Sequence, residues 1–132
     1  LRAGFIVGVL IDQSPRENGV PAKFFGKPCW CTAGPLLAAL RARAPIHVLA
    51  MSRDSTGRYA LEIFPEISMA RSGDLRTDLI NNSQRCQDAI EALVRRYPGQ
   101  WLWLHRRWKA RPELERRWRE RTKPDASRRG NP

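Results

Sequence analysis

The chain has 132 residues, which fits one domain of ordinary size, and 42% of these residues are hydrophobic. This composition excludes a wholly disordered chain. The formal net charge of +11 at pH 7 makes polyanions the expected partners, namely nucleic acid, anionic lipid head groups or an acidic protein.

The positive charge is concentrated near the C-terminus. Residues 95–132 hold 13 Lys and Arg residues against 4 Asp and Glu residues. Within this region, residues 122–132 are polar, include Gly and Pro, and contain no large apolar side chain, so we expect a disordered tail there.

The cysteines do not form a recognisable metal site. Cys29, Cys31 and Cys86 are odd in number, and the Cys-x-Cys spacing has no second pair of ligands nearby. Free cysteine behaves as a small apolar residue, so we predict three buried free thiols and a reducing compartment. No metal and no cofactor are expected.

Residues 4–11 form a continuous apolar run that is rich in β-branched side chains. This pattern predicts a strand covered on both faces, as in a parallel or mixed sheet. The run is far shorter than the ~20 residues that span a bilayer, and it lacks the features of a signal peptide. Because the chain starts with Leu and opens almost directly into this run, we expect a fragment of a longer protein.

Asp12 and Gln13 follow the predicted strand at its C-terminal end. Ligands of open α/β sheets bind at that edge, so both side chains are candidates for a binding site. In an alternative interpretation Asp12 only caps the turn over residues 14–19. Position alone favours neither interpretation.

Further elements follow from local patterns, and together with the first strand they indicate an α/β fold. A short extended piece covers Val20 to Gly26, and a helix begins near Thr32 to Pro35 and buries Ala33, Leu36, Leu37 and Leu40. Strands cover 46–51 and 59–64 around a turn at Thr56 and Gly57. A second helix covers Thr77 to Tyr97, with a buried stripe of Leu79, Ser83, Cys86, Ile90, Leu93 and Tyr97, and a last short helix covers 112–121. In that last helix Glu113 and Glu115 are each four residues before an arginine, at a spacing that favours ion pairs.

Residues 101–109 hold three Trp, one His and three cationic side chains. The pattern fits either a strand or a helix, and we favour a helix. Indole rings, leucines and arginines together suit a membrane interface. Alternatively, the tryptophans are core residues with arginine stacked over them.

No catalytic residue can be assigned from the residues alone. His47 is followed five positions later by Ser52, and His105 by Ala110, so neither histidine has an acid at that spacing to orient it as a base. We expect His47 to be a core histidine, and His105 to be a surface or phosphate contact. A nucleic-acid binder is the less favoured class, because no recognised binding module is present.

Five segments, taken in order, resemble the bacterial lipid A biosynthesis acyltransferases, the lauroyl or myristoyl transferases of the lysophospholipid acyltransferase superfamily. The segments are 10–13 (Leu-Ile-Asp-Gln), 20–28 (Val-Pro-Ala-Lys-Phe-Phe-Gly-Lys-Pro), 32–35 (Thr-Ala-Gly-Pro), 57–63 (Gly-Arg-Tyr, then Leu-Glu-Ile) and 98–109, which ends in Gln-Trp-Leu-Trp-Leu-His-Arg-Arg-Trp-Lys. The resemblance covers residues 4–111, and the last segment is the most specific.

The resemblance implies an inner-membrane enzyme, facing the cytoplasm, that moves a fatty acyl chain from acyl carrier protein to a hydroxyl of a phosphorylated glycolipid. Family members use a His with an acid five positions later as the base, and this chain has no such pair. We therefore expect 1–111 to be the C-terminal part of an acyltransferase domain, with a mixed, partly parallel sheet flanked by helices, and little activity by itself. A short basic helix, 112–121, and the tail would follow.

Carried over position by position, the resemblance implies substrate-binding residues. Asp12 and Gln13 would line the cleft, beside a loop formed by Phe24, Phe25 and Gly26. Arg106 and Arg107 match a basic pair, which we assign on physical grounds to a phosphate or to the acidic carrier protein. The competing hypothesis is a non-catalytic module that binds anionic membranes or an acidic partner.

Overall fold

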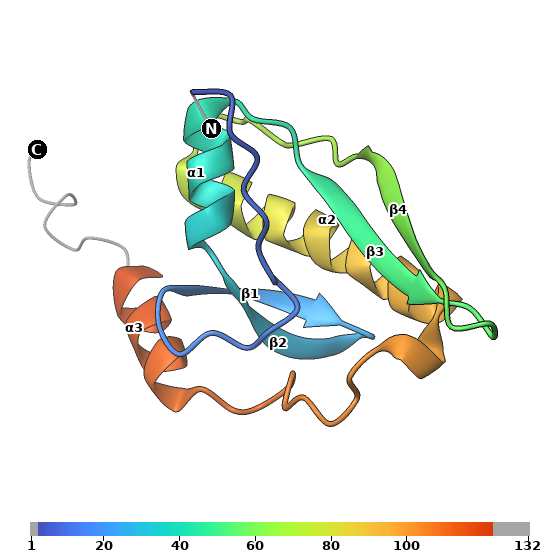
Figure 1. The fold of residues 1–132 in the computed structure, drawn as a ribbon. Helices are drawn as coiled ribbons and strands as arrows, with labels where there is room; N and C mark the ends of the chain where they lie inside the picture. The colour runs from blue at the N-terminus through green and yellow to red at the C-terminus, as the bar shows by residue number, and fades with distance from the viewer. Residues whose placement is uncertain (1–2, 123–132) are drawn as a thin grey trace, which may run out of the picture.

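The computed structural model describes residues 3–122, in which helix α2 passes between two β-hairpins (Figure 1). The elements in chain order are β1 (Gly19–Phe24), β2 (Lys27–Thr32), α1 (Gly34–Ala42), β3 (His47–Arg53), β4 (Tyr59–Glu66), α2 (Leu75–Arg96), the 3-10 turn η1 (Pro98–Gln100) and α3 (Pro112–Thr122). The α/β class is confirmed. Within residues 3–122, however, both sheets are two-stranded and antiparallel rather than partly parallel.

The predicted strand over residues 4–11 is wrong. The segment is a coil (Figure 1). The apolar side chains from Phe5 to Leu10 are exposed, with Ile6 95% exposed, whereas Ile11 is partly buried against the core. A strand buried on both faces needs neighbours on both edges, and no strand of the described residues pairs with it. Its carbonyl at Ile11 accepts a hydrogen bond of 3.2 Å from Gln87 Nε2 on α2.

The β1–β2 hairpin replaces the single extended piece that the sequence predicts. Its turn is formed by Phe25 and Gly26, which both have positive φ angles, of 50° and 72°, as tight hairpin turns with the twist of the strands require. The second strand was not predicted because Pro28 suggested a break. A two-stranded sheet accommodates proline because each strand has a free edge.

Helix α2 begins two residues earlier than the apolar spacing predicts, because Asp74 caps it. The Asp74 carboxylate accepts hydrogen bonds from the backbone N–H groups of Arg76 and Thr77, at 3.1 and 3.4 Å. Gln84 of the helix bonds both to the N–H and to the carbonyl of Lys23, at 2.8 and 3.0 Å. These two bonds hold the edge of β1 against the helix.

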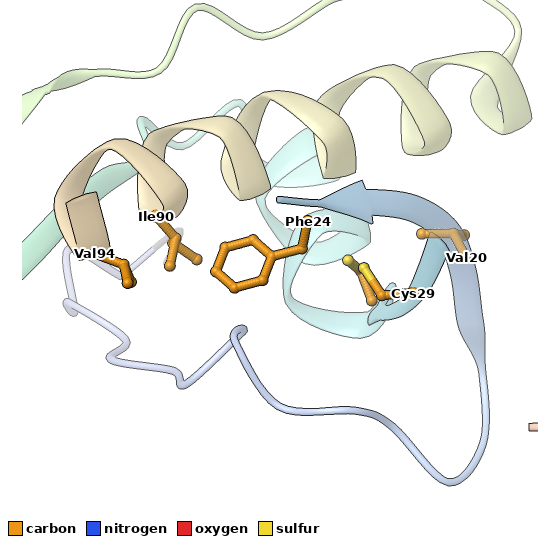
Figure 2. Packing of buried hydrophobic residues seen from close by; sticks show 6 residues of the cluster. Val20, Phe24, Cys29, Ile90 and Val94 are labelled. Carbon is orange, nitrogen blue, oxygen red and sulfur yellow. The ribbon is translucent and has the colours of Figure 1, made fainter. Parts of the chain in front are cut away.

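The core lies between α2 and the β1–β2 hairpin, where Phe24 is completely buried (Figure 2). The other buried members are Val20, Cys29, Cys31, Ile90 and Val94. Of the stripe predicted for α2, Ser83, Cys86 and Ile90 are buried, and of that predicted for α1, Leu36 and Leu40. The three cysteines are free and buried, as predicted.

The β3–β4 hairpin forms where the sequence predicts it, with Asp54 as its turn residue. The Asp54 carboxylate accepts hydrogen bonds from the N–H groups of Thr56 and Arg58, at 2.8 and 3.0 Å. His47 is exposed, so the expectation of a core histidine is wrong. Its Nδ1 lies 3.0 Å from the carbonyl oxygen of Phe64. One face of this hairpin is apolar and exposed, formed by Leu49, Met51, Leu61 and Ile63.

Residues 101–109 are not helical, which corrects the helix that we favoured. The last helix is present as α3, and Arg117 and Arg119 pair with Glu113 and Glu115 at the expected spacing. No described helix is long and apolar enough to cross a membrane. The tail expected over 122–132 lies, apart from Thr122, outside the described residues.

We predict that Phe24→Ala lowers the free energy of unfolding by about 3–5 kcal/mol, because it empties the centre of a packed core. The matched control is Ile6→Ala, which removes a similar apolar volume from an exposed position and should change stability by less than about 0.5 kcal/mol. Urea unfolding followed by tryptophan fluorescence measures both. Equal effects of the two variants would contradict this packing.

Candidate functional site

Residues 101–111, here called the C-terminal wrap, pass along the β1–β2 hairpin between η1 and α3 (Figure 1). Three indole N–H groups fix the wrap to the rest of the fold. Trp101 donates to the Asp12 carboxylate at 3.2 Å, Trp103 to the Pro98 carbonyl at 2.6 Å and Trp108 to the Phe24 carbonyl at 3.0 Å. The wrap is therefore held by side chains rather than by a regular backbone ladder.

The backbone hydrogen bonds of the wrap are those of tight turns rather than of an α-helix. Trp103 N–H donates to the Trp101 carbonyl and Arg107 N–H to the His105 carbonyl, at 2.9 and 2.7 Å. Such bonds span two residues, whereas an α-helix needs bonds that span four. The rings of Trp101 and Trp108 lie 5.5 and 5.9 Å from that of Phe24. Trp101 and Trp108 are therefore partly buried members of the core. Among the described residues, the expected arginine stacking is not found on these two rings: Lys27 lies over Trp108, and Arg107 lies over Phe24.

Arg107 lies in the protein interior with 0% of its surface exposed. Its guanidinium donates to the Trp30 carbonyl and the Gln87 side-chain oxygen, both at 2.7 Å, and to Cys31 Sγ at 3.2 Å. A guanidinium that is fully buried and bonded in this way is not available to a surface ligand. The expected phosphate contact of Arg107 is therefore not supported, and the side chain has a structural role.

The thiols around Arg107 are perturbed in opposite directions. The pKa of Cys31 lies below its ordinary value, chiefly because the Cys29 thiol hydrogen-bonds to it, and the Arg107 charge adds to the effect. The same hydrogen bond, together with burial, raises the pKa of Cys29. Burial raises the pKa of Cys86 to about 11. Cys31 is thus the thiol best placed to carry negative charge beside the buried cation.

Asp12 lies beside the C-terminal wrap. Besides the bond from Trp101, a second link passes through Gln87, which donates to the Ile11 carbonyl at 3.2 Å and accepts from Arg107 at 2.7 Å. The Asp12 side chain is half-buried. Gln13 is exposed.

The three loop residues that the resemblance implies have different environments. Phe24 is a core residue with no exposed surface. Phe25 is half-buried, with the Arg95 guanidinium 4.7 Å from its ring centre and the Trp103 ring at 5.8 Å. Gly26 lies at the exposed hairpin turn. Only Phe25 and Gly26 are placed where a ligand could touch them.

Arg106 lines a shallow groove of about 430 Å³ on the outer side of the C-terminal wrap. The other polar lining residues are Ser14, Arg16, His105, Lys109 and Arg111. Of these, the sequence reasoning singled out only Arg106 and His105. The excess of cations after residue 95 was a signal for Lys109 and Arg111. No sequence pattern indicated Arg16, because it reaches the groove from the loop before β1.

The described residues contain no group of three or more His, Cys, Asp and Glu side chains arranged to hold a metal ion. The groove instead combines three arginines and one lysine without a lining carboxylate. Such a surface binds and orients anions, and it provides no paired acid and base for proton transfer.

A known protein family matches most of the chain. The family described as bacterial lipid A biosynthesis acyltransferase matches residues 1–110. No curated protein matches the chain. The matched range includes Asp12, the β1–β2 hairpin and nearly all of the C-terminal wrap, and it ends before α3.

We predict that Arg107→Ala lowers the free energy of unfolding by about 2–4 kcal/mol, because it leaves the buried oxygens of Trp30 and Gln87 without a donor. Arg107→Lys should not restore stability, since one ammonium cannot replace a planar fork with several donors. Arg106→Ala is the control on the exposed neighbour, with an effect below about 0.5 kcal/mol. Chemical denaturation measures the free energy of unfolding of the three variants. An Arg107→Ala variant as stable as the parent would refute the structural role.

The raised pKa of Cys86 predicts a loss of stability in alkali. Because folding favours the neutral thiol, its contribution is complete below the ordinary thiol pKa and disappears as the pH rises towards about 11. A shift from 9.0 to about 11 corresponds to about 3 kcal/mol. Unfolding free energies between pH 8 and 11 should therefore fall more steeply for the parent than for Cys86→Ala. Parallel pH curves would exclude this contribution.

Proposed function

Because the chain belongs to the bacterial lipid A biosynthesis acyltransferase family, we propose that it forms part of an enzyme that moves a fatty acyl chain from acyl carrier protein to a hydroxyl of a phosphorylated lipid A precursor. The observation that carries this proposal is the family match over residues 1–110. Acyl donors and lipid acceptors are the substrates that the family implies in general. The carrier protein and the glycolipid are the specific substrates proposed here.

In this proposal the side of the fold near Asp12 contributes to the substrate cleft. Asp12 and Gln13 would orient the reacting groups, and Phe25 and Gly26 would border the cleft at the hairpin turn. The bond from Trp101 to Asp12 supports this role, because it fixes the carboxylate beside the C-terminal wrap. Arg106 would contact a phosphate of the acceptor or an acidic group of the carrier protein, while Arg107 holds the wrap in place.

The general base is proposed to come from outside these 132 residues. The family logic requires a histidine whose imidazole is oriented by an acid five positions later, so that it can deprotonate the acceptor hydroxyl. Ser52 and Ala110 occupy those positions after His47 and His105. His47 is also exposed on the edge of a hairpin and His105 lines the cationic groove.

We therefore predict no measurable acyl transfer from acyl carrier protein to a phosphorylated glycolipid by the purified 132-residue chain. The natural gene product that contains this sequence serves as the positive control in the same radiolabel assay. Transfer by the chain alone would show that it holds its own base. A natural gene product that binds both substrates and transfers nothing would overturn the proposed reaction.

The outer side of the C-terminal wrap suits the cytoplasmic face of the inner membrane. Leu102 and Leu104 are 67% and 91% exposed, and Trp103 is half exposed beside them. Arg106 and Lys109 are exposed a few residues later. Apolar and indole groups enter the boundary between head groups and acyl chains, while the cations attract anionic lipid. This same surface is the specific observation that favours the second candidate, a non-catalytic module for anionic membranes.

We predict stronger binding of the chain to phosphatidylglycerol vesicles than to phosphatidylcholine vesicles. The double variant Leu102→Ser/Leu104→Ser should weaken that binding, because it removes the apolar part of the contact. Leu61→Ser is the matched control, an exposed leucine on the β3–β4 hairpin. Vesicle flotation measures all three proteins.

Two results would argue against membrane contact by the wrap. An equal loss in the Leu61→Ser control would show that the contact is not specific to the wrap. Binding to single-stranded RNA with a steep salt dependence, without preference for anionic vesicles, would favour the nucleic-acid class.

A further inference from the structure

The groove outside the C-terminal wrap has the composition of an anion site. The groove is shallow, with a volume of about 430 Å³. Arg16, Arg106, Lys109 and Arg111 line it, and none of its lining residues is acidic. We propose that this groove binds a phosphate monoester, with Arg111 and Arg106 as its principal contacts.

The cations of the groove are not neutralised by the protein. Glu113, the acid nearest to Arg111 along the chain, is bonded to Arg116 and Arg117 of α3 at 2.7 and 2.8 Å. Glu17 is adjacent to Arg16 in the sequence and forms no ion pair within residues 3–122. Among residues 3–122, no ion pair includes any of the four groove cations. Four positive charges around one groove raise the electrostatic potential there, and binding of a highly charged anion lowers it.

Arg111 is held in position before any ligand arrives. Its Nε donates to Ser14 Oγ at 3.1 Å and its Nη2 donates to the Ser14 carbonyl at 3.0 Å. Its Nη1 forms no hydrogen bond within the described residues and remains for a ligand. An arginine ordered in this way loses less conformational entropy on binding than a free one.

The surroundings of the groove indicate which phosphate it binds. Leu102 and Leu104 line the groove together with the cations and are strongly exposed. A ligand that carries a phosphate next to acyl chains matches both parts of this surface, so the natural ligand is a lipid phosphate monoester. This last identification rests on the proposed function, whereas phosphate binding by the groove does not.

The experiment compares vesicles that contain phosphatidic acid, a phosphate monoester, with phosphatidylglycerol vesicles of equal surface charge. We expect the parent chain to bind the phosphatidic acid vesicles about tenfold more tightly, as charge-assisted bonds to a monoester predict. Arg106→Gln/Arg111→Gln should lose this preference. Arg58→Gln, which removes an exposed arginine of the β3–β4 hairpin, should keep it. Circular dichroism verifies that each variant is folded.

Titration with inorganic phosphate distinguishes a site for free phosphate from a site for a lipid head group. Competition by millimolar phosphate, lost in Arg106→Gln/Arg111→Gln, supports the site and assigns it to the phosphate alone. A preference for phosphatidic acid that phosphate does not displace supports a lipid head group. Equal binding to both kinds of vesicle, or the same loss in Arg58→Gln as in the double variant, overturns the proposal. None of these measurements depends on acyl transfer, so a failure of the proposed reaction would be seen separately.

Discussion

The buried guanidinium of Arg107 joins three segments of the structure that are well separated in the sequence. It binds the Trp30 carbonyl and the Cys31 thiol on β2, the Gln87 side chain on α2, and its own backbone belongs to the C-terminal wrap. Desolvating a cation costs several kcal/mol, and several hydrogen bonds are needed to offset that cost. Arg107 has them only when β2, α2 and the wrap are all in place, so the three pieces depend on one another.

This internal role of Arg107 gives the neighbouring cations a different role. Since Arg107 and Trp108 turn towards the core, Arg106 and Lys109 remain on the outside, where they line the groove. The basic pair that the sequence presents as a unit therefore divides into one structural and one surface residue. Composition cannot make this distinction, because both residues add the same charge to the total.

Local patterns were sufficient for α2 and the β3–β4 hairpin, whose spacing and turn residues agree with one another. They were insufficient for residues 4–11 and 101–109, where the outcome depends on whether a partner segment is present. In the site, the family resemblance implied that Asp12 and Gln13 line a cleft, and no local pattern predicted the bond between Trp101 and Asp12. The sequence could not predict that Arg16 and Arg111 share a groove, because their proximity is created by the packing of two distant loops.

The ambiguous periodicity of residues 101–109 has a physical explanation. Trp101 and Trp108 face the core, whereas Leu102 and Leu104 face outward. A helix would have put Trp101, Leu104 and Trp108 on one face, and would have buried a leucine that the structure leaves exposed. The irregular backbone lets core contacts and groove cations alternate within nine residues. Neither the two-residue period of a strand nor the 3.6-residue period of a helix would produce this arrangement. The same short segment can therefore anchor the fold and present an amphipathic surface.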